Sequence, residues 1–175
     1  MEPTVMDNFL PEEDFKIIQQ KLMWGDTVRW VLQDSVSGLE EDDAGKGAVP
    51  NWNFFGVCPV YEFDTPISEL FSPLRKTFGS KLEELKIFKS LIRMKINFYP
   101  WTYEIKEHDS HTDFPFSHIA GIFSLNTCDG YTGFPNGDRI DSVANRMLFF
   151  DGSEPHHSTT TSNAPGRFNI AFNFV

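Results

Sequence analysis

The feature that most constrains the fold is a two-residue alternation of apolar and polar side chains in the second half of the chain. It occurs in LIRMKINFY (91–99) and again in GRFNIAFNFV (166–175). This period places successive side chains on opposite faces of an extended strand. In the last strand one face is large and apolar: Phe168, Ile170, Phe172 and Phe174. Its other face is polar or small: Arg167, Asn169, Ala171 and Asn173. Each stretch is therefore predicted to be a strand with one face in an apolar core.

The first half of the chain shows helical periodicity instead. Residues 8–23 place Pro11 and three acidic residues at the start, which suits the positive end of a helix dipole. Apolar residues then recur at helical spacing. A second helix is predicted to begin near Thr65 and Pro66. Its apolar face is formed by residues three or four apart: Ile67, Leu70, Phe71, Leu74 and Phe78.

The order of the elements favours one fold class. Residues 51–63 are predicted to form a strand or a flap, and the glycine-containing, acidic segment 35–50 is predicted to be a loop. Further short strands are predicted at 101–108, 117–125, 145–150, 155–160 and 167–174. Helices followed by many short strands indicate a β-rich α+β domain, either a sandwich or a small barrel, with the helices packed outside. At 175 residues the chain is expected to form a single domain, 1–175.

Charge and cysteine content narrow the expected partners and compartment. The chain has 25 Asp and Glu against 15 Lys and Arg, a net charge of −10, and no run of basic residues. Such a surface repels a phosphate backbone, so nucleic acid is not an expected partner. Cys58 and Cys128 form no CxxC pair, which is typical of a reduced intracellular protein, although they would allow a single bridge. No apolar run approaches the ~20 residues of a membrane span, and the first residues lack the pattern of a secretory signal. A cytoplasmic protein is expected.

Two histidines and two aspartates lie close together in EHDSHTDFPF (107–116), in a chain with five histidines. His111 and Asp113 are two residues apart, so an extended backbone places both side chains on the same side. An imidazole and a carboxylate on one face form two corners of the two-His-one-carboxylate set that holds Fe(II) and leaves coordination positions open. His108 is expected to be an exposed neighbour, and Asp109 is expected to support a turn.

A third ligand must come from elsewhere, and FFDGSEPHHSTTT offers His156 and His157. Neighbouring strand residues face opposite sides, so only one of the two can point at the metal, and spacing allows either. Arg167 leads the polar face of the last strand. Its guanidinium is suited to hold a ligand carboxylate through two parallel hydrogen bonds, and the alternative is a surface salt bridge with one of the many acids.

From about Asp7 to the C-terminus, the order of these motifs resembles the Fe(II)/2-oxoglutarate-dependent oxygenases of the prolyl 4-hydroxylase-like branch. DNFLPEEDF resembles the opening helix of many members, and NFYPWTYEIKEHDSHTD resembles the segment that delivers the first two ligands. IFSLN followed by DGYTGF resembles the next hairpin, with its GGxTxF pattern, and NRMLFFDGSEPHHS resembles the strand with the distal histidine. The resemblance implies a double-stranded β-helix (jelly roll, cupin-like) core over about 91–175, with N-terminal helices of about 8–90 packed on one sheet.

The resemblance also implies roles for individual residues. It makes His111 and Asp113 the first two iron ligands and Arg167 the partner of the 2-oxoglutarate C5 carboxylate. Tyr99, just before Pro100, matches a tyrosine that often lines the co-substrate pocket. Relatives often show a histidine, any residue and then a small residue, which favours His156 as the third ligand.

Two positions depart from the family pattern. Ser124 stands where relatives commonly place a tyrosine that helps to hold the same carboxylate. Asp129 replaces the first glycine of the GGxTxF pattern, a change expected to alter the turn without reaching the metal.

The function that the resemblance implies is that of a non-haem Fe(II) dioxygenase, with 2-oxoglutarate and dioxygen as co-substrates. It would couple oxidative decarboxylation of 2-oxoglutarate to hydroxylation of a C–H bond, with a peptidyl or free proline as the expected substrate. The alternatives are hydroxylation of another small molecule or amino acid, or a non-catalytic metal-binding jelly roll. Residues 35–50 are a candidate lid. An aromatic wall for the substrate is predicted from Trp52, Phe54, Phe55, Tyr61, Trp101 and Phe114.

Overall fold

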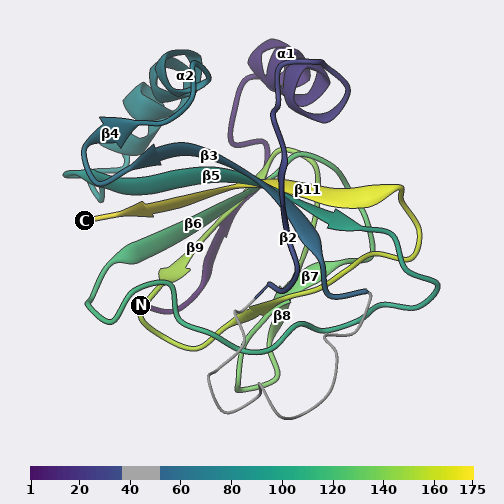
Figure 1. The fold of residues 1–175 in the computed structure, drawn as a ribbon. Coiled ribbons are helices and arrows are strands. Elements are labelled where there is room, and N and C mark those ends of the chain that lie inside the picture. Colours follow the sequence, from purple (N-terminus) through teal and green to yellow (C-terminus); the bar gives the residue numbers. More distant parts are fainter. Residues whose placement is uncertain (37–51) are drawn as a thin grey trace.

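The structure is a computed structural model that describes residues 1–36 and 52–175 (Figure 1). Its major sheet has eight strands in the order β1-β9-β6-β11-β5-β3-β2, with β4 paired to β3, and its minor sheet has the order β10-β7-β8. All of these pairings are antiparallel. In chain order the strands are β1 (Thr4–Met6), β2 (Val31–Gln33), β3 (Phe55–Glu62), β4 (Thr65–Pro66), β5 (Leu91–Pro100), β6 (Ile119–Ser124), β7 (Tyr131–Gly133), β8 (Arg139–Asp141), β9 (Arg146–Asp151), β10 (His157–Ser158) and β11 (Gly166–Phe174).

Helices α1 (Glu12–Met23) and α2 (Phe71–Glu84) lie side by side over the outer face of the major sheet, at the top of Figure 1. The predicted start of α1 is confirmed, because Pro11 occupies its N-cap and three acids fill its first turn. The core between helices and sheet is rich in phenylalanine. Phe78 of α2 packs on Phe123 of β6 and Phe172 of β11, with ring centroids 4.9 and 5.0 Å away. Burial of each such ring stabilises the fold by roughly 1.5–3 kcal/mol.

The alternation that dominates the sequence sets the centre of the major sheet. Strands β5 and β11 pair so that Tyr99 lies opposite Arg167 and Asn97 lies opposite Asn169. Partners in an antiparallel pair share a face, so the two polar faces combine into one polar surface, which points away from the helices. On the other side, the apolar residues of both strands join the helix-facing core.

The second helix begins later than its periodicity predicts. Thr65 and Pro66 form β4 rather than helix, and α2 starts at Phe71. The cause is a tight turn at Phe63 and Asp64, which both have positive φ (43° and 62°) and send the chain back along β3.

Other boundaries also differ from the expectation. The predicted strand 101–108 reduces to isolated bridges at Trp101 and Glu107, and the predicted strand 155–160 shortens to β10. Three strands of three residues each, β1, β2 and β8, had no prediction, whereas β7 lies in the DGYTGF segment of the expected hairpin. The predicted helical region 8–90 also supplies β2, β3 and β4, and β3 pairs directly with β5 from the region 91–175.

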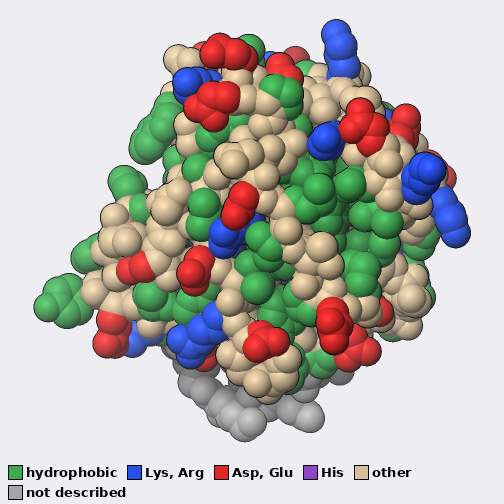
Figure 2. All heavy atoms as spheres, turned by 180° about the vertical axis from the view of Figure 1, so that it is seen from behind, with side chains coloured by type: hydrophobic (Ala, Val, Ile, Leu, Met, Phe, Trp, Pro, Cys, Tyr) green, Lys and Arg blue, Asp and Glu red, His purple; other side chains and the backbone are tan. Residues whose placement is uncertain are grey.

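Three further expectations concern the loop, the cysteines and the membrane. The predicted loop and candidate lid at 35–50 falls, from residue 37 onward, outside the described residues. Cys58 and Cys128 are both buried and free, so they do not form the bridge that the sequence allowed. In the described ranges, no helix has the length and apolar character needed to cross a membrane. On the face shown in Figure 2, Lys and Arg side chains are scattered among Asp and Glu side chains.

Candidate metal and co-substrate site

Three of the predicted ligands come together between the two sheets. His111, Asp113 and His156 each offer one donor atom, and these atoms all lie within 4.8 Å of one another. Backbone hydrogen bonds fix this arrangement: the amide of each histidine donates to the carbonyl of the other at 2.9 Å. The amide of Asp113 donates to the carbonyl of Gly152 at 3.0 Å. Segments far apart in the sequence are therefore joined at the point where the ligands meet.

The two imidazole rings are oriented by their own backbone. Nδ1 of His156 lies 3.0 Å from the carbonyl oxygen of Glu154, and Nδ1 of His111 lies 3.4 Å from that of Asp109. A carbonyl next to Nδ1 favours the tautomer with the proton there, which leaves Nε2 as a lone-pair donor. Burial lowers the pKa of His156 to about 4, and burial also lowers the pKa of His111. Both rings are therefore neutral at pH 7, the form that binds a metal.

The structure distinguishes between the two neighbouring histidines. Nε2 of His156 lies 3.9 Å from Oδ2 of Asp113. His157 also borders the cavity, but its Nε2 lies 3.8 Å from Glu107 and its ring packs edge-on against Tyr131. The cluster therefore contains His156 and not His157.

The carboxylate of Asp113 is held on both oxygens. Arg93 of β5 donates from Nη2 to Oδ1 at 2.5 Å, and Asn173 of β11 donates from Nδ2 to Oδ2 at 2.8 Å. Arg93 also donates from Nε to Oδ1 of Asn173 at 3.0 Å. Burial raises the pKa of Asp113, but the positive charges of Arg93 and Lys95 outweigh this and hold the pKa below its ordinary value. Asp113 is therefore ionised and fixed in orientation.

At the far end of the polar surface lies Arg167, 1% exposed. Its Nε donates to Ser142 at 2.7 Å, its Nη2 donates to Thr132 at 2.9 Å, and its guanidinium carbon lies 5.5 Å from the ring centroid of Tyr99. Nη1 has no hydrogen-bond partner among the described residues. Burial lowers the pKa of Arg167. An unsatisfied buried guanidinium N–H costs ~1–3 kcal/mol or more, so this end of the cavity suits a ligand carboxylate.

One cavity connects the two ends. Its walls are the polar faces of β5 and β11, one residue of β6, the metal-ligand candidates and the inner side of the minor sheet: Lys95, Asn97, Tyr99, His111, Asp113, Ile122, Thr132, His156, His157, Ser158, Arg167, Asn169 and Ala171. Tyr99 is 6% exposed, lines this cavity and lies opposite Arg167 in the pairing of β5 with β11. Ser124 is buried on β6 and pairs with Asn169, but it does not line the cavity. Thr132 and Ser142 supply the hydroxyl contacts to Arg167.

Asp129 replaces the first glycine of the GGxTxF pattern, but the second glycine, Gly130, is present in this chain. A Cβ on Gly130 would lie 2.7 Å from the carbonyl oxygen of Thr160 and 2.9 Å from Cδ of Arg167, so only glycine leaves room for the arginine. The carboxylate of Asp129 accepts hydrogen bonds from the hydroxyl of Thr161 and the amide of Ser162. It stabilises the turn and does not line the cavity.

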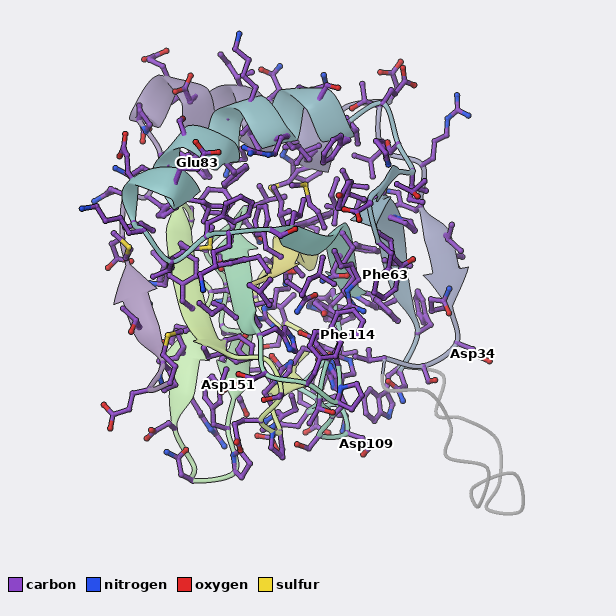
Figure 3. The ribbon with its side chains drawn as sticks, turned by 90° about the vertical axis from the view of Figure 1, so that its left-hand side faces the viewer. Asp34, Phe63, Glu83, Asp109, Phe114 and Asp151 are labelled. Carbon is purple, nitrogen blue, oxygen red and sulfur yellow. The ribbon has the colours of Figure 1, made fainter. Side chains whose placement is uncertain are left out.

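The remaining histidines and Asp109 have structural surroundings. His108 is buried, not exposed as predicted: its ring lies between Tyr99 and Trp52, and its Nδ1 is 2.9 Å from the hydroxyl of Ser158. His118 is buried against Gly152 and does not line the cavity. Asp109 is exposed (Figure 3), and its carbonyl oxygen rather than its side chain contacts His111.

The six aromatic residues predicted to form one wall for the substrate do not form a single surface. Phe55 stacks on Tyr99, and Tyr61 stacks on Phe71, so both are taken up by packing. Phe114 lies close to Phe63, as Figure 3 shows. A separate surface groove contains the other three: Trp52, Phe54 and Trp101.

Sequence reasoning also missed several polar residues of the site. Arg93, Lys95 and Asn97 alternate with apolar residues in LIRMKINFY, and Asn173 belongs to the polar face of the last strand. The alternation was visible, but nothing in the spacing showed that this polar face is enclosed by a second sheet rather than exposed to water.

No protein-family model matches the chain, and no curated protein is similar to it in sequence. Solved structures do match. A prolyl hydroxylase from Trichoplax adhaerens, in complex with a hypoxia inducible factor oxygen degradation domain peptide fragment, is 16% identical, with a TM-score of 0.63 over 98% of this chain and 83% of that one. An oxidoreductase of the 2OG-Fe(II) oxygenase family from Burkholderia pseudomallei is 8% identical, with a TM-score of 0.69 over 98% and 84%.

A third match has a different activity. The non-heme alpha ketoglutarate dependent epimerase SnoN from nogalamycin biosynthesis is 12% identical, with a TM-score of 0.60 over 99% of this chain and 77% of that one. At these identities the likeness concerns the fold, and the predicted β-rich α+β jelly roll with helices on one sheet is confirmed. The chain therefore has the double-stranded β-helix fold of the 2OG-Fe(II) oxygenases, prolyl hydroxylases included, and carries a His-x-Asp…His cluster inside it.

Proposed function

We propose that this protein is an Fe(II)- and 2-oxoglutarate-dependent dioxygenase that hydroxylates a C–H bond of its substrate. The observation that carries the proposal is the pairing, in one cavity, of a His-Asp-His cluster with a buried guanidinium whose Nη1 has no partner among the described residues. A metal site alone would need no such cation. A cation buried without a carboxylate is costly unless a ligand supplies one.

The residues divide the work of binding. Nε2 of His111, Nε2 of His156 and the carboxylate of Asp113 would hold the metal and leave three of six positions open. Arg167 would bind the distal carboxylate of 2-oxoglutarate through Nη1. The hydroxyls of Ser142 and Thr132 already hold this guanidinium in place.

When bound, Fe(II) would supply activation of dioxygen, whose one oxygen atom would end in succinate as 2-oxoglutarate loses carbon dioxide and whose other atom would end in the hydroxyl group of the product. The protein's own part is placement and exclusion of water. Phe150 packs edge-on against His156, with centroids 4.7 Å apart, and Ile122 covers another side of the cavity. We propose a free or peptidyl proline as the substrate, a choice supported by the fold shared with prolyl hydroxylases.

The test begins with the metal and co-substrate. Purified protein is mixed anaerobically with Fe(II) and 2-oxoglutarate, and the weak visible charge-transfer band of the chelate is recorded. We expect the band in the wild type. Arg167→Ala should weaken 2-oxoglutarate binding by ~100-fold or more while metal affinity changes little, since one charge-assisted contact pair is lost far from the metal. Arg75→Ala, on the outer helix α2, is the matched control and should change neither.

Two other outcomes are distinguishable. Metal binding without a band, and without thermal stabilisation by 2-oxoglutarate, would indicate a non-catalytic metal-binding jelly roll. A band with 2-oxoglutarate turnover, but with a product epimerised rather than enriched by one oxygen atom in mass spectrometry, would indicate the activity of the epimerase neighbour instead of hydroxylation.

A further inference from the structure

Lys95 is a cation of the cavity that the proposed function leaves without a role. It lies on β5 between Arg93 and Asn97, on the face that lines the cavity. Its partner on β11 is Ala171 and its partner on β3 is Pro59, and neither side chain offers it a polar contact. The next pair along the strands is Arg93 with Asn173, the two residues that hold Asp113. Lys95 is therefore at the metal end of the cavity.

The half-buried ammonium of Lys95 has no counter-ion among the described residues. No carboxylate in this part of the chain lies within 4.0 Å of it, and no described residue makes a hydrogen bond with it. Asp113, the acid in the same cavity, already accepts from Arg93 on one oxygen and from Asn173 on the other. Glu62 acts on Lys95 only from beyond ion-pair distance.

The charges around the cavity do not balance even when it is filled. A divalent metal and dianionic 2-oxoglutarate together carry no net charge. Three cationic side chains, Arg93, Lys95 and Arg167, then stand against two carboxylates, Asp113 and Glu62, which leaves one positive charge in excess. Asp113 contacts Arg93, and Arg167 would contact the distal carboxylate of the co-substrate. Of these three cations, Lys95 is therefore the one without a carboxylate at ion-pair distance.

Lys95 lies far along the sheet from Arg167, which marks the end of the cavity proposed for the co-substrate. Lys95 and Tyr99 are four residues apart on β5, which is roughly 13 Å at 3.3 Å per residue. Tyr99 is the register partner of Arg167. When Arg167 binds the distal carboxylate of 2-oxoglutarate, that carboxylate is too far from Lys95 to contact it as well.

We propose that Lys95 binds an anionic group of the primary substrate, so that the substrate is a carboxylate-bearing small molecule, such as a free amino acid, rather than an internal residue of a peptide. This inference rests on the proposed function, because it assumes that 2-oxoglutarate occupies Arg167. An internal prolyl residue presents only neutral amides and would leave the half-buried ammonium without a counter-ion. A free carboxylate supplies the missing charge close to the metal.

The first experiment uses benzoate and its neutral isostere benzamide as probes. The protein is loaded with Mn(II) and 2-oxoglutarate, and paramagnetic broadening of the ring protons is measured by NMR during titration. We expect benzoate to be broadened at concentrations at which benzamide is not. In Lys95→Met, benzoate affinity should fall at least ~10-fold, while 2-oxoglutarate affinity stays within about twofold of wild type. Lys95→Arg should retain binding, because it keeps the positive charge.

Controls separate a binding role from a structural one. Lys21→Met, at an exposed lysine of α1, should behave as wild type. The melting temperature of metal-free Lys95→Met should stay the same or rise, because the half-buried lysine makes no ion pair with a described residue that the substitution could remove. A structural lysine would give the opposite shift. If Lys95→Met does not fold, Lys95→Gln gives the same comparison with a neutral polar side chain.

Turnover gives a second reading with matched substrates. Succinate release is compared for L-proline, L-prolinamide and a blocked prolyl peptide. The inference is overturned if benzamide binds as well as benzoate, if Lys95→Met leaves benzoate binding unchanged or weakens 2-oxoglutarate instead, or if the blocked peptide is the better substrate. Failure of the proposed function looks different, because the Fe(II)/2-oxoglutarate band would then be absent from wild type and Lys95→Met alike.

Discussion

The two faces of the central strands β5 and β11 are both buried, yet they contribute in opposite ways. The face toward the helices consists of apolar side chains such as Ile96, Ile170 and Phe172, all 1% exposed or less. The face toward the minor sheet consists of polar and charged side chains such as Lys95 and Arg167. Burial of the first face stabilises the fold, whereas burial of the second carries a desolvation cost. Because side chains alternate between the two faces, the same strands place the residues that stabilise the fold on one face and the residues of the candidate site on the other.

The strongest test of this comparison removes a proposed ligand from the inner face. Asp113→Ala should abolish metal binding, measured by isothermal titration with Mn(II), and should lower substrate-dependent succinate formation more than about 1000-fold. Asp113→Asn is the matched variant, since its amide oxygen still accepts from Asn173 but carries no charge. Retained metal binding in the alanine variant would remove Asp113 from the ligand set.

A substitution on the face toward the helices should lower the stability of the fold and leave metal affinity nearly unchanged. Phe172→Ala leaves a cavity beneath α2, where the ring contacts Phe78, and should lower the free energy of unfolding by about 3–5 kcal/mol. Urea unfolding measures this loss. Metal affinity of the folded fraction at low temperature should change less than about threefold, because the ligands lie on the other face. A large loss of metal affinity without a loss of stability would contradict the separation of the two faces.

The inner face should also make the metal-free protein sensitive to acid. Burial lowers the pKa of His156 and of His108 to about 4, from an ordinary value of 6.5. Between these values the unfolded chain binds protons that the folded chain does not, so the free energy of unfolding must fall as the pH is lowered from 6.5 toward 4. Each histidine accounts for roughly 3 kcal/mol at most.

Urea unfolding at several pH values measures this slope, and His156→Gln should remove part of it, because burial also lowers the pKa of His108 and His111. Addition of Mn(II) should steepen the slope in the wild type and not in His156→Gln, because a metal binds only the deprotonated ring. A flat profile in this window would show that the two rings are not buried in neutral form.

The same two faces explain how far the sequence could be read. The apolar periods of α1, β5 and β11 predicted these elements because each has one face in the same core. His111, Asp113 and Arg167 were candidates from their spacing and residue type, the family resemblance gave them roles, and the structure brings them to one cavity. The short strands β7 and β8 have three residues each, too few for a period to show. Arg93, Lys95 and His108 were missed or misplaced because their burial depends on a second sheet that forms only in the folded chain.

The smallest expected effect concerns the residue that orients a ligand without touching the metal. Asn173 donates to Oδ2 of Asp113 at 2.8 Å and accepts from Arg93 at 3.0 Å, so it fixes the carboxylate and its cationic partner together. Asn173→Ala should weaken Mn(II) binding by about 10–100-fold, the usual range for an outer partner of a metal ligand. Asn173→Asp replaces the donor to Asp113 by a negative charge, and this second carboxylate would compete with Asp113 for Arg93. Asn169→Ala, two residues away on the same face, is the control, since Asn169 pairs with Asn97 and not with a ligand. Equal losses in Asn173→Ala and Asn169→Ala would mean that the polar surface as a whole, and not the bond to Asp113, sets metal affinity.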